Sequence, residues 1–409
     1  MQTQRNNILQ LSLILGILCA LAGLFYANYL FSRQVPGGNN FLNRWVGARY
    51  WLVEGIQPYD ERVSLEAQRM IYGRPSDITA SEDSGDFIYP LPVMIFLAPF
   101  GLFPYPIARA LWMTFSQLAL PLLTIVAVRI TDWRINRWWY AVLLVFSLLW
   151  YPSLRSVLIG QFTIIEAVLI AGGILAVKHE NDQLAGVLFA LSIAKPQMPF
   201  LILPYVVLWG FWQHRWQLVL WTLGGIVLLV GGFMLLLPEW PILWLRQILA
   251  YPIYTEAGSP VEIIAQWLPG IQRPLELTLS GVFALYLLWE WLVSLNKPVN
   301  WFLWTAMMTL VITNLIAFRT ATANYVMLLP ALVLGLSKIQ GRWKKAGSIV
   351  VVVTLLAILA GGWALFLLTV EGNTESQLMY LPLPFSTFFL LLWTRWWTVR
   401  TTRLPVLSK

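Results

Sequence analysis

Long runs of apolar residues without a charge recur along the chain, and they constrain its fold more than any other feature. The first run, Leu11–Ala27, holds 17 residues without a charge. A straight transmembrane helix needs about 20 predominantly apolar residues. Only 11% of the 409 residues are charged, whereas an average soluble domain is about 25% charged. Lipid must therefore cover much of the surface, and the sequence predicts a polytopic integral membrane protein.

Twelve transmembrane helices fit this pattern in an all-α bundle that forms a single membrane domain, residues 1–409. The first is predicted to be retained, because its apolar run is longer than the core of a cleavable signal peptide. Several others are shorter than a straight span requires. The spans are predicted at residues 8–31, 106–129, 138–152, 158–177, 183–194, 198–212, 217–237, 275–294, 299–317, 322–337, 347–370 and 379–394.

The segment 32–104, between the first two spans, is the only one large enough to form a small subdomain outside the membrane. Within it, Phe41–Glu54 and Arg62–Tyr72 are predicted to be amphipathic helices separated by a turn. Tyr89–Phe103 is apolar but short and contains several prolines. It is therefore predicted to be a re-entrant or interfacial helix.

The charges of the connecting segments predict the orientation. Cytoplasmic loops carry an excess of Lys and Arg, and alternate segments of this chain do so when both termini are placed in the cytoplasm. The acid-rich first loop then faces outward. The net charge of +8 is explained by this bias toward an anionic inner leaflet and does not indicate nucleic-acid binding. The predicted inner cations are Arg5, Arg129, Arg134, Arg137, Lys178, Arg215, Lys297, Lys338, Arg342, Lys344, Lys345, Arg395, Arg400, Arg403 and Lys409.

The residue types available for chemistry are few. The chain has two histidines, His179 and His214, both in predicted inner loops, and one cysteine, Cys19, within an apolar run. No metal-ligand, nucleotide-binding glycine or Cys-x-x-Cys pattern is present. No metal and no cofactor are therefore expected, and chemistry must use carboxylates, cationic side chains and backbone groups.

Three cations lie at predicted outer ends of spans, opposite to the general bias: Arg155, Lys195 and Arg319. A charge this close to hydrocarbon is costly unless it is paired, lines a cavity or reaches the headgroups. Together the three would form a site for an anionic headgroup such as a lipid phosphate. The alternative is that each reaches lipid phosphates separately. Glu166 either pairs with one of these cations or is a buried structural carboxylate.

The first loop contributes two carboxylates on the same predicted side, Asp60 and Asp86. Each is next to an aromatic residue, Tyr59 and Phe87, and lies near a predicted helix end. Most loop acids are simply solvated, and this remains the alternative for both.

An ordered series of short motifs resembles family 87 of the glycosyltransferases, which are GT-C-type membrane enzymes. The resemblance covers roughly residues 35–335. The motifs are Gly47-Ala48-Arg49, Glu54-Gly55-Ile56-Gln57-Pro58-Tyr59-Asp60, Phe87-Ile88-Tyr89-Pro90-Leu91-Pro92, Gly160-Gln161, Ala185-Gly186, Lys195-Pro196-Gln197 and Arg215-Trp216.

The resemblance implies an inverting transfer of a hexose, of which mannose is expected, from a polyprenyl-phosphate donor at an outward-facing site. A first-loop carboxylate would act as general base, and cations would stabilise the departing phosphate. Lys195, Arg155 and Arg319 are then expected to bind the donor phosphate, and Asp60 or Asp86 to activate the acceptor. Gln161, Gln197, Tyr59 and Tyr89 are expected to contact sugar or acceptor.

One position departs from the family pattern. The early-loop aspartate of the family should fall at residue 40, which is Asn40 here, and an amide cannot accept a proton at neutral pH. Three explanations are open: another acid, Asp60 or Asp86, acts as the base; the chain is an inactive or engineered variant of an active enzyme; or the alignment of this loop is shifted.

The sequence thus favours a monomeric glycosyltransferase of a bacterial plasma membrane, with lipids and a lipid or glycan acceptor as its partners. A transporter of lipid-linked glycans is an alternative, since broken helices and inward-facing charges also suit transport. It predicts matching interrupted segments in both halves, and only the pair around Lys195 is present. An inactive family member with a binding role is the third reading.

Overall fold

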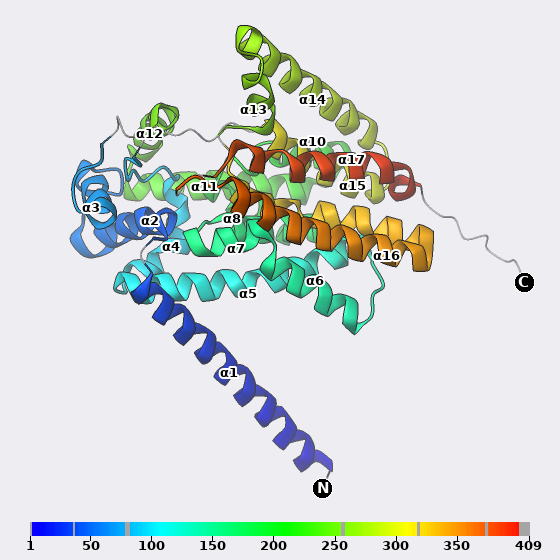
Figure 1. The fold of residues 1–409 in the computed structure, drawn as a ribbon, viewed down its shortest axis with the longest axis horizontal. Coiled ribbons are helices and arrows are strands. Elements are labelled where there is room, and N and C mark those ends of the chain that lie inside the picture. Colours follow the sequence, from blue (N-terminus) through cyan, green and yellow to red (C-terminus); the bar gives the residue numbers. More distant parts are fainter. Residues whose placement is uncertain are drawn as a thin grey trace, which may run out of the picture. The chain divides into compact units, whose positions relative to one another are not determined.

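The structure is a computed structural model, and it describes residues 2–35, 37–77, 82–254, 258–316, 320–372 and 375–400. These residues form helices and connecting segments, with no β-strand among them (Figure 1). The predicted all-helical class is therefore confirmed for this part of the chain. The helices assemble into two compact units.

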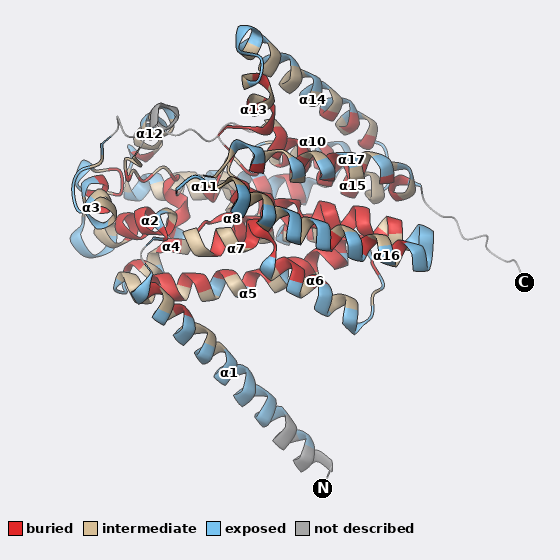
Figure 2. Ribbon diagram, in the orientation of Figure 1, coloured by how far each residue is buried: buried red, intermediate tan, exposed pale blue. Residues whose placement is uncertain are grey.

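Unit 1 contains the residues up to Ile88 together with Met94–Leu118 and Val157–Gln161. Its long first helix carries exposed apolar side chains along most of its length (Figure 2). Such a surface is stable when lipid rather than water covers it. The helices of unit 1 are α1 (Gln2–Gln34), α2 (Asn39–Arg49), the π-helix η1 (Tyr50–Glu54), α3 (Glu61–Tyr72), α4 (Met94–Gly101) and the first half of α5 (Tyr105–Thr131).

Local signals explain the two helices predicted in the first loop, which are confirmed. Gly55 ends η1 in the left-handed conformation, where glycine carries no Cβ penalty. Asp60 is the N-cap of α3 and accepts a hydrogen bond from the backbone N–H of Arg62. Gly73, again left-handed, ends this helix. The predicted short apolar segment 89–103 forms a 3₁₀ turn, η3 (Leu91–Val93), followed by α4.

Unit 2 contains Tyr89–Val93, Ala119–Ser156 and the residues from Phe162 onward. Its centre is formed by α8 and α15, which are buried on nearly all sides (Figure 2). Its helices are α6 (Arg137–Leu149), α7 (Tyr151–Ile159, shared with unit 1), α8 (Thr163–Lys178), α9 (Asp182–Leu191), η4 (Ser192–Ala194), α10 (Ile202–Trp212), α11 (Trp216–Leu236), α12 (Trp240–Tyr254), α13 (Pro260–Gln266), η5 (Pro269–Ile271), α14 (Gln272–Ser294), α15 (Val299–Ile316), η6 (Thr322–Leu328), α16 (Leu329–Thr369), η7 (Gln377–Tyr380) and α17 (Pro382–Val399).

Three polar side chains inside α15 donate hydrogen bonds within the helix. Thr309 and Thr313 donate to the carbonyl oxygens four residues earlier, at 2.8 and 2.7 Å. Asn314 does the same through its amide nitrogen, at 2.9 Å. These bonds remove the cost of unpaired polar atoms in a buried, apolar setting.

The segment labelled α16 reverses direction at Lys344, where φ is 52° and ψ is −116°. A Cβ added to Gly347 would lie 2.6 Å from the carbonyl oxygen of Ile339. Two residues eight positions apart in a straight helix are about 12 Å apart along its axis, so the two arms must fold back on each other. The sequence predicted this reversal as two spans with a cationic turn between them.

The predicted count of twelve spans is not confirmed. Seven described helices are long and apolar enough to cross a membrane, or eight if α6 and α7, bent by 49°, count as one. Several predicted spans are instead short helices, such as α9 and α10. The chain leaves the helical conformation at Lys195, between these two, as predicted. The helices α12 and α13 were not predicted.

One cation lies elsewhere than predicted. Arg395 was placed in the inner C-terminal tail after the last span, but it lies within α17 and pairs with Glu290 of α14 through two contacts of 2.9 and 3.0 Å. Glu290 is fully buried, and the guanidinium also stacks near Trp301 and Trp304. Arg395 therefore joins α14 and α17.

Candidate functional site

In unit 1, Arg44 connects α2 to the turn that follows α7. It is buried, and its guanidinium donates to the carbonyl oxygen of Gly160 at 2.7 Å and to Oε1 of Gln161 at 3.2 Å. Arg44 was not among the site residues predicted from the sequence. Gln161, a predicted sugar contact, is thus held by a buried cation within this unit.

The same turn requires a glycine. Gly160 has φ of 73°, and a Cβ there would lie 2.4 Å from Cβ of Phe41. Phe41 is itself fully buried and stacks on Trp112 of α5. The close approach of α2 to this turn therefore depends on residue 160 having no side chain.

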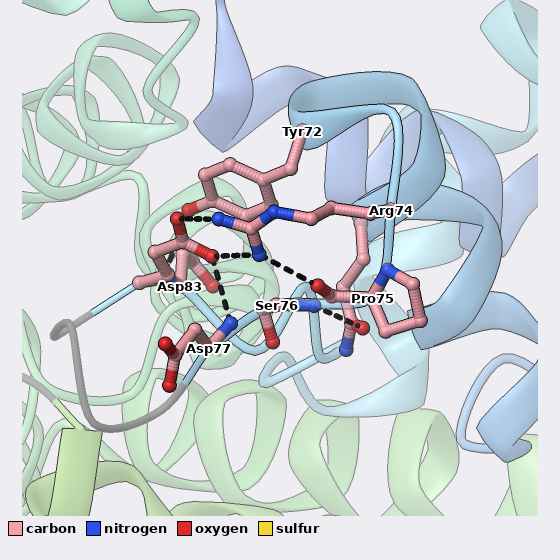
Figure 3. Close-up of polar contacts among 8 residues, drawn as sticks. Tyr72, Arg74, Pro75, Ser76, Asp77 and Asp83 are labelled. Carbon is pink, nitrogen blue, oxygen red and sulfur yellow. Dashed lines mark hydrogen bonds and ion pairs between the residues drawn. The ribbon is translucent and has the colours of Figure 1, made fainter.

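The loop after α3 is closed by polar contacts (Figure 3). Arg74 donates to both carboxylate oxygens of Glu82 at 2.9 and 2.7 Å, and the backbone N–H of Asp77 donates to the same carboxylate. The hydroxyl of Tyr72 accepts a hydrogen bond from the backbone N–H of Asp83 (Figure 3). These contacts fix the segment that carries Asp83 and Asp86.

Both carboxylate oxygens of Asp60, the first predicted base, accept hydrogen bonds from Arg62. Arg62 contacts both of its oxygens at 2.9 Å, and the backbone N–H of Arg62 donates to it as well. The side-chain hydrogen bond from Arg62 is the main reason that the pKa of Asp60 is lowered to about 2. A carboxylate with so low a pKa is a weak proton acceptor.

Asp86, the second predicted base, accepts hydrogen bonds from two serine hydroxyls, Ser64 at 2.7 Å and Ser84 at 2.6 Å. Its neighbour Asp83 was not selected from the sequence. Burial raises the pKa of Asp83, and the charge of Asp86 raises it further while Arg44 lowers it. Asp83, Asp86 and Arg44 therefore lie within electrostatic range of one another.

The aromatic residues of this loop pack together. Tyr59 is buried and meets Phe87 edge to face, with ring centroids 5.5 Å apart. A Cβ on Gly47 would lie 2.5 Å from the Phe87 ring, so Phe87 rests directly on α2. Asn40 lies in the first turn of α2 and is half-buried.

In unit 2, Lys195 lies in a buried polar cluster. Its ammonium group donates to Oγ1 of Thr163 at 2.8 Å and to Oδ1 of Asn324 at 2.7 Å, and the side chain is only 3% exposed. Glu166 is fully buried within the electrostatic field of Lys195. Neither carboxylate oxygen of Glu166 has a hydrogen-bond partner among the described residues.

Arg155 belongs to a second polar cluster in unit 2. Its Nε lies 2.7 Å from Oε1 of Glu375, and the hydroxyl of Tyr151 donates to the same oxygen at 2.7 Å. Thr322 donates to the other oxygen of Glu375. Glu375 thus joins α7 to η6.

The short helix η6 connects the two clusters, because Thr322 contacts the partner of Arg155 and Asn324 contacts Lys195. Of the three predicted phosphate-binding cations, Lys195 therefore contacts η6 directly and Arg155 is linked to it through Glu375. The third, Arg319, lies outside the described residues. It immediately precedes Thr320, which accepts a hydrogen bond from Asn324 at 3.3 Å.

Two further predicted contacts also lie in unit 2. Gln197 is half-buried, two residues beyond Lys195. Tyr89 is buried and meets Phe162 edge to face, with centroids 6.5 Å apart. Because Phe162 directly precedes Thr163, Tyr89 packs next to the Lys195 cluster.

The residues that hold the predicted site residues were not predicted from the sequence: Arg44, which contacts Gln161, and Thr163, Asn324, Thr322 and Glu375, which belong to the clusters of Lys195 and Arg155. The only local signal was their polarity, because Asn324 falls within a predicted apolar span and Glu375 is one of two acids in a short connecting segment. Within the described residues, no group of three or more His, Cys, Asp or Glu side chains is placed to hold a metal ion.

Residues 87–319 match glycosyltransferase family 87, a family of the GT-C-like membrane class. This stretch is more than half of the chain, and the protein therefore belongs to that family. The match includes Arg155, Lys195 and Arg319 and begins just after Asp86. No curated protein and no solved structure matches the chain.

Proposed function

We propose that this membrane glycosyltransferase transfers a hexose, with mannose as the favoured sugar, from a polyprenyl-phosphate donor to a lipid or glycan acceptor. The observation that carries the proposal is the linkage of two cations to η6 in unit 2, Lys195 directly through Asn324 and Arg155 through Glu375. Lys195 is buried and hydrogen-bonded, and Arg155 is half-buried and held by an ion pair. Cations held in place in this way are suited to a leaving group that develops negative charge.

An apolar groove in unit 2 supports a lipid-borne donor. It has a volume of about 970 Å³ and runs between the two arms of α16 and α17. Tyr151 and Thr322 line one end of it, and both contact Glu375, the partner of Arg155. A polyprenyl chain lying in this groove would bring its phosphate to the cations around η6.

The proposed reaction needs one proton acceptor and no metal or cofactor. The acceptor hydroxyl attacks C1 of the sugar and forms the new C–O bond, while the bond between C1 and the phosphate oxygen breaks with inversion. The phosphate leaves with the electron pair, and Lys195 and Arg155 stabilise it. The hydroxyl proton passes to a first-loop carboxylate.

We assign this base role to Asp86 in preference to Asp60. Both oxygens of Asp60 are held by Arg62, whereas Asp86 is oriented by two neutral serine hydroxyls. Gln161, Gln197, Tyr59 and Tyr89 remain proposed contacts to sugar or acceptor. Arg319 remains a proposed phosphate contact.

The proposed orientation follows the charge bias of the sequence. Both termini lie in the cytoplasm, and the first loop faces outward from a bacterial plasma membrane. The protein acts as a monomer.

The test is transfer from radiolabelled polyprenyl-phosphate sugars by the purified full chain. We expect Asp86→Asn to lower turnover at least 100-fold and Asp60→Asn, the matched control, to change it little. Lys195→Met should also abolish transfer, with Lys195→Arg retaining part of it. Absence of transfer with every donor, both in the natural chain and after Asn40→Asp, would exclude the catalytic proposal.

Turnover only after Asn40→Asp would instead favour the reading of an inactive relative with a binding role. Loss of transfer in Asp60→Asn but not in Asp86→Asn would overturn the base assignment while leaving the transferase assignment intact.

A further inference from the structure

A second cavity in unit 2, of about 790 Å³, combines positive charge with indole rings. It lies where the end of α5, the turn of α16 and the end of α17 meet. Four cations line it, one each from the segments after α5 and α17 and two from α16, together with three tryptophans: Arg134, Lys338, Arg342, Arg400, Trp133, Trp396 and Trp397.

The positive charge of this cavity is not cancelled by protein carboxylates. Its only acidic lining residue is Asp132, which forms an ion pair of 2.6 Å with Lys178. Within the described residues, none of the four lining cations has a carboxylate oxygen within 4 Å. The guanidinium of Arg400 lies over the ring of Trp396, 3.8 Å from its centroid.

The cavity lies at the end of unit 2 opposite the Arg155–Glu375 cluster. Residues 345–369 form one arm of α16, which is about 37 Å long at 1.5 Å per residue. That length is enough to cross the hydrocarbon core of a bilayer, and Glu375 follows the far end of this arm. The cavity therefore does not belong to the proposed donor-phosphate site.

The indole rings indicate the level of the lipid headgroups. Trp343, Trp393 and Trp397 pack against one another beside the cavity, with centroids 5.4 to 6.3 Å apart. Tryptophan is enriched at the boundary between hydrocarbon and water. In the proposed topology, this end of unit 2 faces the cytoplasm.

We propose that this cavity binds the phosphate headgroup of an anionic phospholipid in the leaflet on that side. Guanidinium and ammonium groups donate charge-assisted hydrogen bonds to phosphodiester oxygens, and basic pockets between transmembrane helices bind such headgroups. The site is distinct from the donor-phosphate site and does not depend on the glycosyltransferase assignment.

A lipid fits this cavity better than a soluble phosphate because apolar surface adjoins it. Ile339 and Trp393 line the near end of the apolar groove between α16 and α17. Ile339 directly follows Lys338, and Trp393 lies one turn before Trp396 and Trp397, which line the cavity. An acyl chain attached to a phosphate in the cavity would therefore meet apolar side chains rather than water.

The test measures the affinity of the purified full chain for phosphatidylglycerol and for phosphatidylcholine with identical acyl chains, by lipid titration and native mass spectrometry. The variant Arg134→Gln/Arg342→Gln removes two lining cations. The control Arg137→Gln/Lys345→Gln removes two exposed cations that do not line the cavity. We expect the first variant to bind phosphatidylglycerol about 20-fold more weakly and the control to stay within about twofold.

Three outcomes would overturn the proposal. An equal loss of affinity for phosphatidylglycerol in both variants would mean that general surface charge attracts the lipid. Equal affinity of the natural chain for both lipids would mean that no anionic site exists. Competition by soluble glycerol phosphate as effective as that by the lipid would assign the cavity to a soluble anion. If the first variant does not fold, the salt dependence of binding to the natural chain tests the proposal instead. A preference for phosphatidylglycerol that does not weaken as the salt concentration rises would overturn it.

Discussion

Some buried ionisable side chains of this protein have hydrogen-bond partners that offset the free-energy cost of burying them, and others do not. Lys195 has two oxygen partners from Thr163 and Asn324, whereas the fully buried Glu166 has only the field of that ammonium group. A buried charge without its partner is strongly destabilising. Lys195 is therefore expected to support the fold as well as the proposed donor site.

This coupling predicts a non-additive result. Lys195→Met should destabilise the protein by about 1–3 kcal/mol, because Thr163 and Asn324 lose a buried donor and Glu166 loses the favourable field of the ammonium group. Adding Glu166→Leu should recover part of that loss, since the buried carboxyl group is then gone. Thermal unfolding of the two single variants and the double variant in the same detergent measures the coupling. Additive losses would show that Glu166 and Lys195 do not interact.

Two acids of the first loop, Asp83 and Asp60, are expected to change the stability of the protein with pH in opposite directions. Burial raises the pKa of Asp83, so the folded loop holds a proton more tightly than the unfolded chain does. The stabilising contribution of its protonation is present at low pH and is lost as the pH rises through the raised pKa. The lowered pKa of Asp60 has the reverse sign, and its contribution is lost as the pH falls from about 4 to about 2.

At pH 4 the Tm of the Asp83→Asn variant should therefore be nearly equal to that of the natural protein. At pH 8 the Tm of the variant should be higher than that of the natural protein. The amide keeps an oxygen that can accept from the N–H of Gly85, as Asp83 does at 2.8 Å. The measurement is the difference in Tm between the two proteins from pH 4 to pH 8. A difference that does not change with pH would contradict a raised pKa for Asp83.

At the scale of helices, close packing depends on where a glycine faces a neighbour. Gly186 of α9 lies against α11, and a Cβ there would be 2.4 Å from Cβ of Trp221 and 2.8 Å from the backbone nitrogen of Thr222. Small residues allow helices in membranes to approach this closely. Gly224 of α11 has no atom within 4 Å of an added Cβ.

Gly186→Ala should therefore lower the stability of unit 2 by about 1–3 kcal/mol, because backbone atoms of α11 must move. Gly224→Ala is the matched control and should be neutral or slightly stabilising, since alanine favours the helix. Both are measured by thermal unfolding in detergent. Equal effects at the two positions would contradict the observed contact between α9 and α11.

For the molecule as a whole, the reversal at Lys344 decides whether α16 is one long helix or two arms that each run in their own direction. A straight helix of 41 residues would be about 60 Å long, twice the thickness of the hydrocarbon core. The two folded arms instead place Arg342 and Glu371 at opposite ends of residues 345–369, an arm that can cross the membrane once.

Single cysteines at these two positions should therefore react with an impermeant thiol reagent from opposite sides of the membrane. The background is Cys19→Ser, which removes the only natural thiol. We expect Arg342→Cys to react from the side of the predicted cytoplasmic loops and Glu371→Cys from the other side. Labelling of both from the same side would contradict a crossing by this arm.

The sequence alone determined the features that depend on neighbours along the chain. Apolar runs predicted the membrane class, the proline and lysine at 195–196 predicted the break between α9 and α10, and the loop composition predicted α2 and α3. Segments with mixed polarity, such as those that form α12 and α13, gave no such signal. The twelve predicted spans exceed the seven or eight described helices that are long and apolar enough to cross a membrane, because apolar helices shorter than a bilayer resemble complete spans in composition.

Only the tertiary structure decided which side chains meet. It paired Arg155 with Glu375, 220 residues further along the chain, and Arg395 with Glu290, and it placed Lys195 beside Asn324. Helix and loop patterns are set by local conformational preference and hydropathy, which the sequence displays directly. Contacts between distant segments depend on how the helices pack, and a single sequence contains no local signal for them.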